Sequence, residues 1–213
     1  MKISSIKQQV KDQTRVSIFL EGKYSFSLTL DQLLSEKLKK DDELDEQRID
    51  ELKKLSDEGK LRLRALEWLM GRPHSTREFR DYLYRKKASK EHIEVLIEEF
   101  SDKKYLDDEY FAKWFAEGRL RKNKSIKAIR SELITKGISP VTIQSIALEL
   151  KDEKDDKEAI RLLVSKLRNR TRYQDSKKMT AYLLSKGFQW SDIKDVLSSA
   201  ENNDLPEEFI ASE

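Results

Sequence analysis

Cysteine is absent from this chain of 213 residues, and His74 and His92 are its only histidines. Without cysteine there is no disulfide framework, no thiolate nucleophile and no thiolate metal ligand, as is typical of proteins from reducing compartments. Two separated histidines also argue against histidine-based catalysis and against a multi-histidine metal site. We expect both histidines to lie on the surface, His74 in a turn and His92 in the first turn of a helix.

Glycine and proline are also scarce, with six and three residues. All-β and loop-rich folds consume both residues in turns, so their scarcity favours helix. No apolar run reaches the length of about 18 residues that a membrane-spanning helix needs, and the N-terminus lacks the apolar segment of a secretory signal. The sequence also lacks a glycine-rich phosphate loop and the common catalytic motifs. We therefore expect a cytoplasmic, non-enzymatic protein without a cofactor, a metal or a membrane span.

Charge, by contrast, is abundant, because 39% of the residues are Asp, Glu, Lys or Arg although the formal net charge is only +3. Residues 1–60 carry 12 basic and 13 acidic side chains, and residues 61–200 carry 31 and 22. Residues 201–213 carry five acidic side chains and no basic one. A basic body with an acidic tail is the pattern of a protein that meets a polyanion, or meets a protein bound to one.

Residues 1–44 are predicted to form a small β-containing module. Apolar residues alternate from Thr14 to Leu30 on both sides of Glu21-Gly22-Lys23, which indicates a β-hairpin. A lone hairpin is marginally stable in water, so residues 3–10 are expected to supply a third strand. Residues 31–38 have the pattern of a short helix packed on this sheet.

A charged helical connector is predicted over residues 45–60, with Asp45 as its N-cap. The apolar pattern leaves open whether one long helix runs on to Met70 or whether two helices join near Gly59. Gly71-Arg72-Pro73 should end this helical segment, because glycine favours the position after a helix and proline cannot continue one.

The chain repeats itself with a period of 50 residues. Three segments of 21 residues, starting at Arg77, Lys127 and Lys177, align without a gap. Each segment contains two sets of apolar residues at helical spacing, which predicts two helices. A Lys-Gly pair separates these helices in the second and third segments and suits a left-handed C-cap. A further helix precedes each pair, over residues 61–70, 107–121 and 155–167.

Helix caps agree with these boundaries, because Ser75-x-x-Glu78 forms a capping box, Ser89 can cap the next helix and Ser139-Pro140 starts another. We therefore predict a mainly α fold in which tandem three-helix repeats form an elongated curved array after the β-hairpin module. The predicted repeats are residues 61–106, 107–152 and 153–200, followed by an acidic tail at 201–213.

Asp107-Asp108-Glu109 is the only tight carboxylate cluster. Acidic residues are favoured at a helix N-terminus, where they interact with the helix dipole, and an apolar run follows directly. We interpret the cluster as structural. The third repeat has Asp155-Asp156-Lys157-Glu158 at this place instead of Asp-Asp-Glu, which argues against equal use of all three repeats in binding a partner.

Basic residues recur where the first helix of each repeat meets the second. One such cluster alone is equally well explained as a solvated surface, but recurrence in every repeat favours a basic stripe that binds phosphates. The candidate partner- or DNA-binding residues are Arg72, Arg77, Arg80, Arg119, Arg121, Lys122, Lys124, Lys127, Arg130, Arg168, Arg170, Arg172, Lys177 and Lys178.

Several motifs resemble those of the RecX family of bacterial recombinase regulators. The resemblance covers residues 61–200, and its most specific part is Tyr105-Leu106-Asp107-Asp108 with the following Phe111-Ala112. The hairpin at Leu20-Glu21-Gly22-Lys23-Tyr24 is similar to the extra module of members from Gram-positive bacteria.

This resemblance implies a non-enzymatic modulator in DNA recombination and repair, and we expect the chain to be a monomer. Members of the family bind the RecA recombinase, lie in the groove of its filament on DNA, and inhibit ATP hydrolysis and strand exchange. Two alternatives remain open. The chain could bind DNA directly through a repeated basic stripe, or it could be an α-helical repeat adaptor for another protein.

Overall fold

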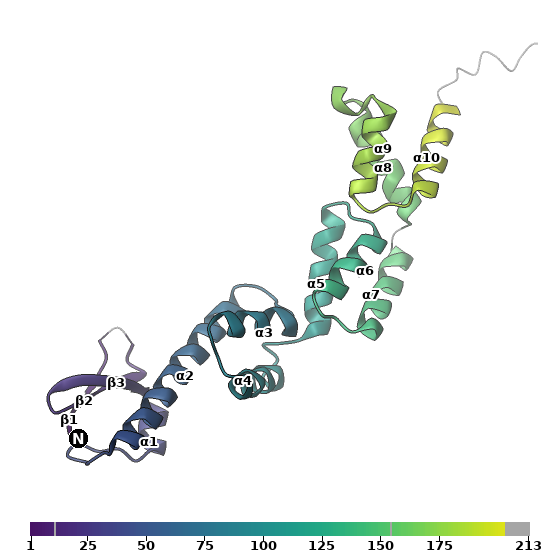
Figure 1. Ribbon diagram of the computed structural model, residues 1–213. Helices are drawn as coiled ribbons and strands as arrows, with labels where there is room; N and C mark the ends of the chain where they lie inside the picture. Colours follow the sequence, from purple (N-terminus) through teal and green to yellow (C-terminus); the bar gives the residue numbers. More distant parts are fainter. Residues whose placement is uncertain (11, 154, 203–213) are drawn as a thin grey trace, which may run out of the picture. The chain divides into compact units, whose positions relative to one another are not determined.

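The computed structural model describes residues 1–10, 12–153 and 155–202, so most of the acidic tail lies outside the described residues (Figure 1). The strands are β1 (Ile3–Gln8), β2 (Arg15–Leu20) and β3 (Lys23–Thr29). The helices are α1 (Leu30–Ser35), α2 (Glu46–Met70), α3 (Thr76–Arg85), α4 (Lys90–Asp102), α5 (Asp108–Arg121), α6 (Ile126–Thr135), α7 (Pro140–Glu153), α8 (Asp156–Arg168), the 3-10 helix η1 (Thr171–Tyr173), α9 (Ser176–Ser185) and α10 (Trp190–Asn202). None of the helices in these ranges is long and apolar enough to cross a membrane.

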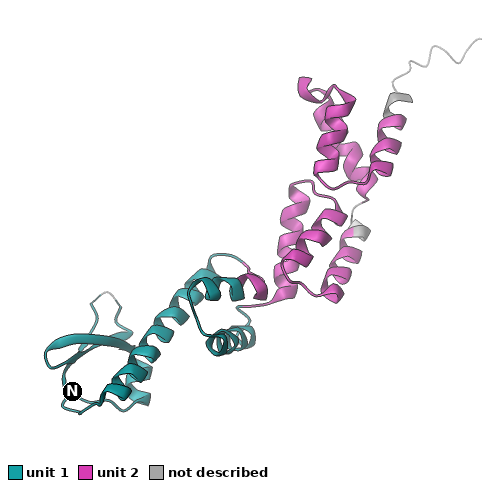
Figure 2. Ribbon diagram, in the orientation of Figure 1, with its two compact units in different colours: residues 1–72, 79–105 teal, residues 73–78, 106–213 magenta. Residues whose placement is uncertain are grey.

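The chain divides into two compact units (Figure 2). Unit 1 contains Met1–Arg72 and Phe79–Tyr105, which are the β-module, α2, most of α3 and α4. Unit 2 contains Pro73–Glu78 and Leu106–Glu213, which include the start of α3 and helices α5 to α10. The predicted mainly α fold with three-helix repeats is confirmed, because α2–α4, α5–α7 and α8–α10 follow one another along the chain.

The N-terminal module is a three-stranded antiparallel sheet with the order β1-β2-β3. Glu21 and Gly22 both have positive φ, as a two-residue hairpin turn requires. The predicted third strand and the short helix that follows the hairpin are both present. Buried Ile18 and Leu28 from the sheet pack in one core with Leu52 of α2, so the module is closed by the long helix.

Helix α2 is continuous, which resolves the question of a break near Gly59 and joins the predicted connector to the first helix of the first repeat. Asp45 caps it by accepting a hydrogen bond from the Arg48 N–H at 2.7 Å. Glycine is favoured at position 59 inside the helix because a Cβ atom there would lie only 2.8 Å from the Gln32 side-chain amide. The helix ends at Met70, as predicted from Gly71-Arg72-Pro73, and Gly71 has a right-handed backbone with a φ of −69°.

In unit 1, the C-terminal half of α2 packs on α3 and α4 through aromatic side chains. Trp68 stacks on Tyr82 with 4.6 Å between ring centroids, and Phe79 meets Phe100 edge-to-face at 5.6 Å. Arg62 of α2 forms a bidentate pair with Glu99 of α4, with Nε at 2.8 Å from Oε2. The Arg62 guanidinium, followed by Lys103, lowers the pKa of Glu99 to about 2.

Unit 2 contains one core for each three-helix repeat. Phe111, Ile129 and Ile143 belong to the core of α5–α7, whereas Ile160 and Leu183 belong to that of α8–α10. Separate small cores leave much of each helix exposed, which accounts for the high content of charged residues. The two cores are linked by polar contacts at the helix ends.

The turns between the second and third helices have the predicted left-handed conformation. The φ angles are +79° at Gly137 and +91° at Gly187. Lys87 takes the same position in the first repeat with φ +62°, although a side chain is disfavoured there. The predicted serine caps also form, since Ser89 accepts from the His92 N–H at 3.2 Å and Ser139 from the Thr142 N–H at 3.1 Å.

Candidate functional site

The predicted basic residues separate into two groups, of which the first is engaged in internal contacts. Arg80 pairs with Glu94, and Arg119 pairs with Glu132 and lies 4.3 Å from the Phe115 ring centroid. The other members of this group are Arg121, which pairs with Glu117, Lys124, whose Nζ donates to the Ser185 carbonyl, Lys178, which lies 4.0 Å from Asp175, and Arg172, which lies over Tyr173. The contacts of Arg80 and Arg119 connect different helices, that of Lys124 connects the turn before α6 with α9, and the ion pairs in this group reduce the charge that is available to a partner.

The second group consists of exposed cations. They are Arg77, Lys122, Lys127, Arg130, Arg170 and Lys177, and none of them has an ion-pair partner among the described residues. Arg72 and Arg168 are exposed as well. Lys127 and Arg130 are particularly well placed, because they lie one turn apart on α6 and project from the same helix.

An open groove of about 530 Å³ runs along this side of α6. Lys127, Arg130 and Ile134 line it from α6, and Ile134 exposes 62% of its surface. Asp155 and Asp156 at the start of α8 line the opposite side. The groove therefore presents cationic and apolar groups next to each other, with two carboxylates across from them.

Equivalent positions of the other repeats carry similar residues. Tyr84 in α3 and Leu184 in α9 correspond to Ile134 and expose 46% and 47% of their surface. Their basic counterparts on the same helices are Arg77 and Arg80 in the first repeat and Lys177 in the third. We call these positions the second-helix face: residues 77, 80 and 84, residues 127, 130 and 134, and residues 177, 180 and 184.

The start of α6 is bonded to the end of α9. Ser125 caps α6 by accepting from the Ala128 N–H at 3.1 Å, and its hydroxyl donates to the Gly187 carbonyl at 2.6 Å. The Ser125 N–H donates to the carbonyl of Lys186 at 3.0 Å. Ser125 is fully buried, so these polar groups are paired with protein atoms rather than with water.

The same arrangement occurs where the start of α3 meets the end of α6, within unit 2. The Ser75 hydroxyl donates to the Lys136 carbonyl at 2.8 Å and accepts from the Glu78 N–H at 3.1 Å. The Glu78 carboxylate pairs with Lys136 Nζ at 2.7 Å. We call the two sets of contacts, at Ser75 and at Ser125, the repeat seams.

The acidic cluster completes each repeat seam. Asp107 caps its own helix, accepting from the Glu109 and Tyr110 N–H groups, while Asp108 accepts from the Thr76 N–H at 2.8 Å. In the third repeat, Asp155 accepts from the Lys157 N–H at 3.2 Å, and Asp156 accepts from the Ile126 N–H at 3.4 Å. These hydrogen bonds support the structural interpretation of the cluster, and the two aspartates of the third repeat have the same structural roles as Asp107 and Asp108.

Burial raises the pKa of Asp156, and the carboxylates of Asp192 and Asp155 act in the same direction against the hydrogen bond from Ile126. The raised pKa of Asp156 is explained by its burial in the repeat seam and does not indicate a catalytic acid or base. No group of three or more His, Asp or Glu residues with metal-binding geometry occurs in the described ranges.

The expectation that His74 lies on the surface is wrong, because only 5% of it is exposed. Its Nδ1 lies 3.2 Å from the Glu78 carboxylate, whose other oxygen accepts from Lys136. His74 is therefore covered where the start of α3 meets α6, a contact between segments about 60 residues apart.

A second concentration of cations was not predicted. Lys54, Lys60 and Arg64 on α2 line a groove together with Lys86 and Lys87 from the turn after α3. The two segments lie more than 20 residues apart in the sequence, and acidic residues lie between the cations of α2. No local signal could have indicated that folding brings these five side chains together.

Comparison with known proteins identifies relatives over nearly the whole chain. A family model described as the regulatory protein RecX N-terminal domain matches residues 1–45, and one described as the second three-helix domain of RecX matches residues 107–145. The regulatory protein RecX of Bacillus subtilis (strain 168) is 34% identical over 203 residues, which cover 93% of this chain and 75% of that protein. The corresponding protein of Bacillus pumilus is 31% identical over 202 residues, covering 93% and 77%. A crystal structure of a regulatory protein RecX matches 92% of this chain and 98% of its own with a TM-score of 0.69 and 26% identity.

Proposed function

Because the chain belongs to the RecX family of regulatory proteins, we propose that it binds the RecA recombinase filament on DNA and inhibits ATP hydrolysis and strand exchange. It acts as a cytoplasmic monomer without catalytic activity of its own. The observation that carries this proposal is the second-helix face of α6, where Lys127 and Arg130 are exposed beside Ile134 along an open groove.

A mixed basic and apolar face suits a filament in which protein and nucleic acid lie next to each other. Cations draw the protein to a surface of negative potential, and a buried apolar contact such as Ile134 stabilises the complex after the encounter. The repeat seam at Ser125 fixes α6 relative to α9, so the second-helix faces of the two repeats are held at one spacing. Fixed spacing reduces the entropy lost when several faces bind a regular partner.

The test is the DNA-dependent ATPase activity of the cognate recombinase, measured with and without the full chain. We expect inhibition at stoichiometric amounts by the unmodified protein. The Lys127→Glu/Arg130→Glu variant should need at least about tenfold more protein for equal inhibition, because reversal of exposed interfacial charges slows association. Full inhibition by this variant would remove the α6 face from the proposal.

A matched control is available on other helices of the same unit. Arg161 of α8 and Lys194 of α10 are also exposed and have no ion-pair partner in the described part of the chain. The Arg161→Glu/Lys194→Glu variant changes the net charge by the same amount and should inhibit like the unmodified protein. Equal loss in both variants would mean that total charge, rather than the second-helix face, determines inhibition.

The two other functions predict different results in this assay. A protein that only binds DNA directly would inhibit by occupying DNA, and excess DNA would abolish the effect. An adaptor for a different protein would leave the ATPase activity unchanged at stoichiometric amounts, and that result would overturn the proposal.

A further inference from the structure

The groove beside α6 has two cations whose charge no described residue compensates. Lys127 and Arg130 line it and are exposed, and neither forms an ion pair among the described residues. The two carboxylates across the groove, Asp155 and Asp156, accept hydrogen bonds from backbone N–H groups in the first turns of α8 and α6. The α6 side therefore favours an anionic ligand, and Ile134 beside the cations favours an apolar one.

The three side chains on α6 follow one line along the helix. Lys127, Arg130 and Ile134 are spaced by three and four residues, so they lie on the same helix face. At 1.5 Å per residue the line is about 10 Å long. A matching ligand carries two anionic groups followed by apolar side chains over this length.

The chain itself contains a segment with this pattern. Residues 203–213 lie outside the described residues, and their sequence holds four acidic side chains and no basic one. Within it, Glu207-Glu208-Phe209-Ile210 places two acidic residues directly before two large apolar ones. Four residues in an extended conformation span about 10 Å, which equals the length of the line on α6.

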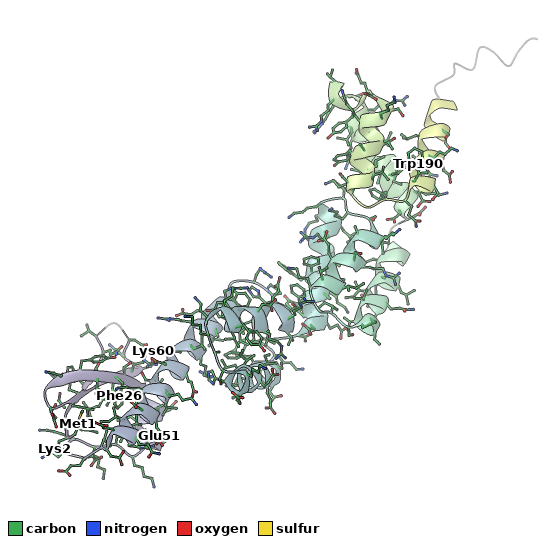
Figure 3. The ribbon with its side chains drawn as sticks, viewed as in Figure 1. Met1, Lys2, Phe26, Glu51, Lys60 and Trp190 are labelled. Atoms are coloured by element: carbon green, nitrogen blue, oxygen red, sulfur yellow. The ribbon has the colours of Figure 1, made fainter. Side chains whose placement is uncertain are left out.

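The tail is also long enough to reach the groove. Gln189 lines the groove, and α10 begins at the next residue, Trp190, which is labelled in Figure 3. The 12 steps from Trp190 to Asn202 carry the chain about 18 Å along α10. The six residues from Asn202 to Glu208 span up to about 20 Å when extended, so the acidic pair can return to the groove.

We propose that the segment Glu207-Glu208-Phe209-Ile210 binds in the α6 groove of its own chain and competes there with the partner. Its carboxylates pair with Lys127 and Arg130, and its apolar side chains cover Ile134. The competition rests on the proposed function, whereas the binding of the tail to the groove does not.

The equivalent face of α9 fits this segment less well. Lys177 is the basic residue there, but position 180 is a threonine, so a second cation is missing before Leu184. A pair of carboxylates therefore finds two cations in line with an apolar residue on α6 and one such cation on α9. This difference favours α6 as the site.

Attachment to the same chain makes a weak contact sufficient. A short connection gives the segment an effective concentration in the millimolar range, so a Kd of about 1 mM would leave the groove about half occupied. Occupancy for half to nine-tenths of the time weakens the apparent affinity for a partner about two- to tenfold. The tail would thus reduce binding at one face, and a partner that binds several faces would still displace it.

The first test uses a spin label on the tail of the full chain, without recombinase. The chain has no cysteine, so Ser212→Cys provides a single attachment site next to the segment. We expect the label to broaden the backbone amide signals of residues 127–134 more strongly than those of α9. A mixture of isotope-labelled chain without spin label and spin-labelled chain without isotope should show no broadening, because the contact lies within one chain.

Charge reversal and its rescue make this test specific. The Lys127→Glu/Arg130→Glu variant should lose the broadening of α6, because carboxylates then face carboxylates. Adding Glu207→Lys/Glu208→Lys should restore most of it, because opposite charges face each other again. Broadening that survives the first exchange, does not return after the second, spreads evenly over unit 2 or appears in the mixture would overturn the proposal.

The competition is measured separately in the recombinase ATPase assay. The Glu207→Lys/Glu208→Lys variant should need about two- to tenfold less protein for half-inhibition than the unmodified chain. Its matched control is Asp204→Lys/Glu213→Lys, which changes the charge of the tail by the same amount outside the segment and should gain less. Equal gains would overturn competition at the groove. Absence of inhibition by every form would contradict the proposed function, and the spin label would still decide whether the tail binds.

Discussion

Replacement of Gly187 by alanine tests whether the repeat seam holds α6 and α9 together. Gly187 has φ +91°, and a Cβ atom there would lie 2.5 Å from the Ala128 Cβ and 2.8 Å from the Ser125 hydroxyl. The Ala128 Cα follows at 3.4 Å, so the opposing atoms belong to the start of a helix and cannot turn away like the end of a flexible side chain. The two helix ends must separate to admit the methyl group.

Two costs add at this position. A left-handed backbone costs a residue with a Cβ about 1–2 kcal/mol, and overpacking at a close contact costs about 1–3 kcal/mol. Gly187→Ala should therefore destabilise the third repeat by about 2–5 kcal/mol. Gly22 isolates the first cost, since its φ is +80° and no atom lies within 4 Å of the place that a Cβ atom would take, so Gly22→Ala should cost the sheet only about 1–2 kcal/mol.

Hydrogen exchange of backbone amides measures both effects locally, in α6 and α9 for Gly187→Ala and in β2 and β3 for Gly22→Ala. We expect the loss of protection to be larger at the seam. Adding Ala128→Gly removes the nearest opposing atom, so the double variant should regain part of the lost protection. Glycine at position 128 itself lowers helix stability, and this cost is subtracted by measuring Ala128→Gly alone. An equal loss in the two single variants, or no recovery in the double variant, would refute the close-contact argument.

Three further predictions concern the seam and unit 1. Ser125→Ala removes a helix cap and a buried donor and should cost about 2–3 kcal/mol in thermal unfolding, whereas Ser139→Ala removes an exposed cap and should cost about 1 kcal/mol; equal losses would contradict a buried seam. The pKa of Glu99 is lowered to about 2, so its ion pair stabilises the folded state above the unfolded pKa near 4.5, and this stabilisation is lost as the pH falls toward 2. The free energy of unfolding of Glu99→Gln, measured as a function of pH, should lack this loss. Burial raises the pKa of Asp156, so its charge opposes folding at neutral pH and Asp156→Asn should be at least as stable at pH 7, with a smaller gain on acidification in the same assay; a less stable variant at pH 7 would show that the hydrogen bond needs the charge.

The helices and their repeat could be predicted because their signals are local. Apolar spacing, serine caps and Lys-Gly turns each lie within a few residues, and the structure places helices where these signals indicate them. Asp155 and Asp156 have the structural roles of Asp107 and Asp108 although the third repeat lacks the complete Asp-Asp-Glu element. Capping the helix and contacting the neighbouring repeat require two carboxylates, and the third acidic residue of the cluster, Glu109, is not needed for either contact.

The features that could not be predicted depend on contacts between distant segments. His74 is buried because the start of α3 meets residues of α6 about 60 positions later, and nothing around His74 in the sequence indicates this contact. Arg80 and Arg119 pair with carboxylates of other helices. The position of these two residues in the sequence does not show that they form internal ion pairs. For the candidate site, the residue types could be predicted from the sequence. Which basic side chains form internal ion pairs, and which are left exposed for a partner, could not.

The repeat seams give the array a direction, and the middle repeat alone carries both complementary ends. Its Ser125 supplies the helix-start half of one seam, and its Gly137 supplies the helix-end half of the other. In the first repeat, Lys87 occupies the helix-end position, where the close approach seen at Gly137 would leave no space for a side chain. A duplicated middle repeat is therefore the natural building block for lengthening this protein, whereas the first repeat is built as a terminus.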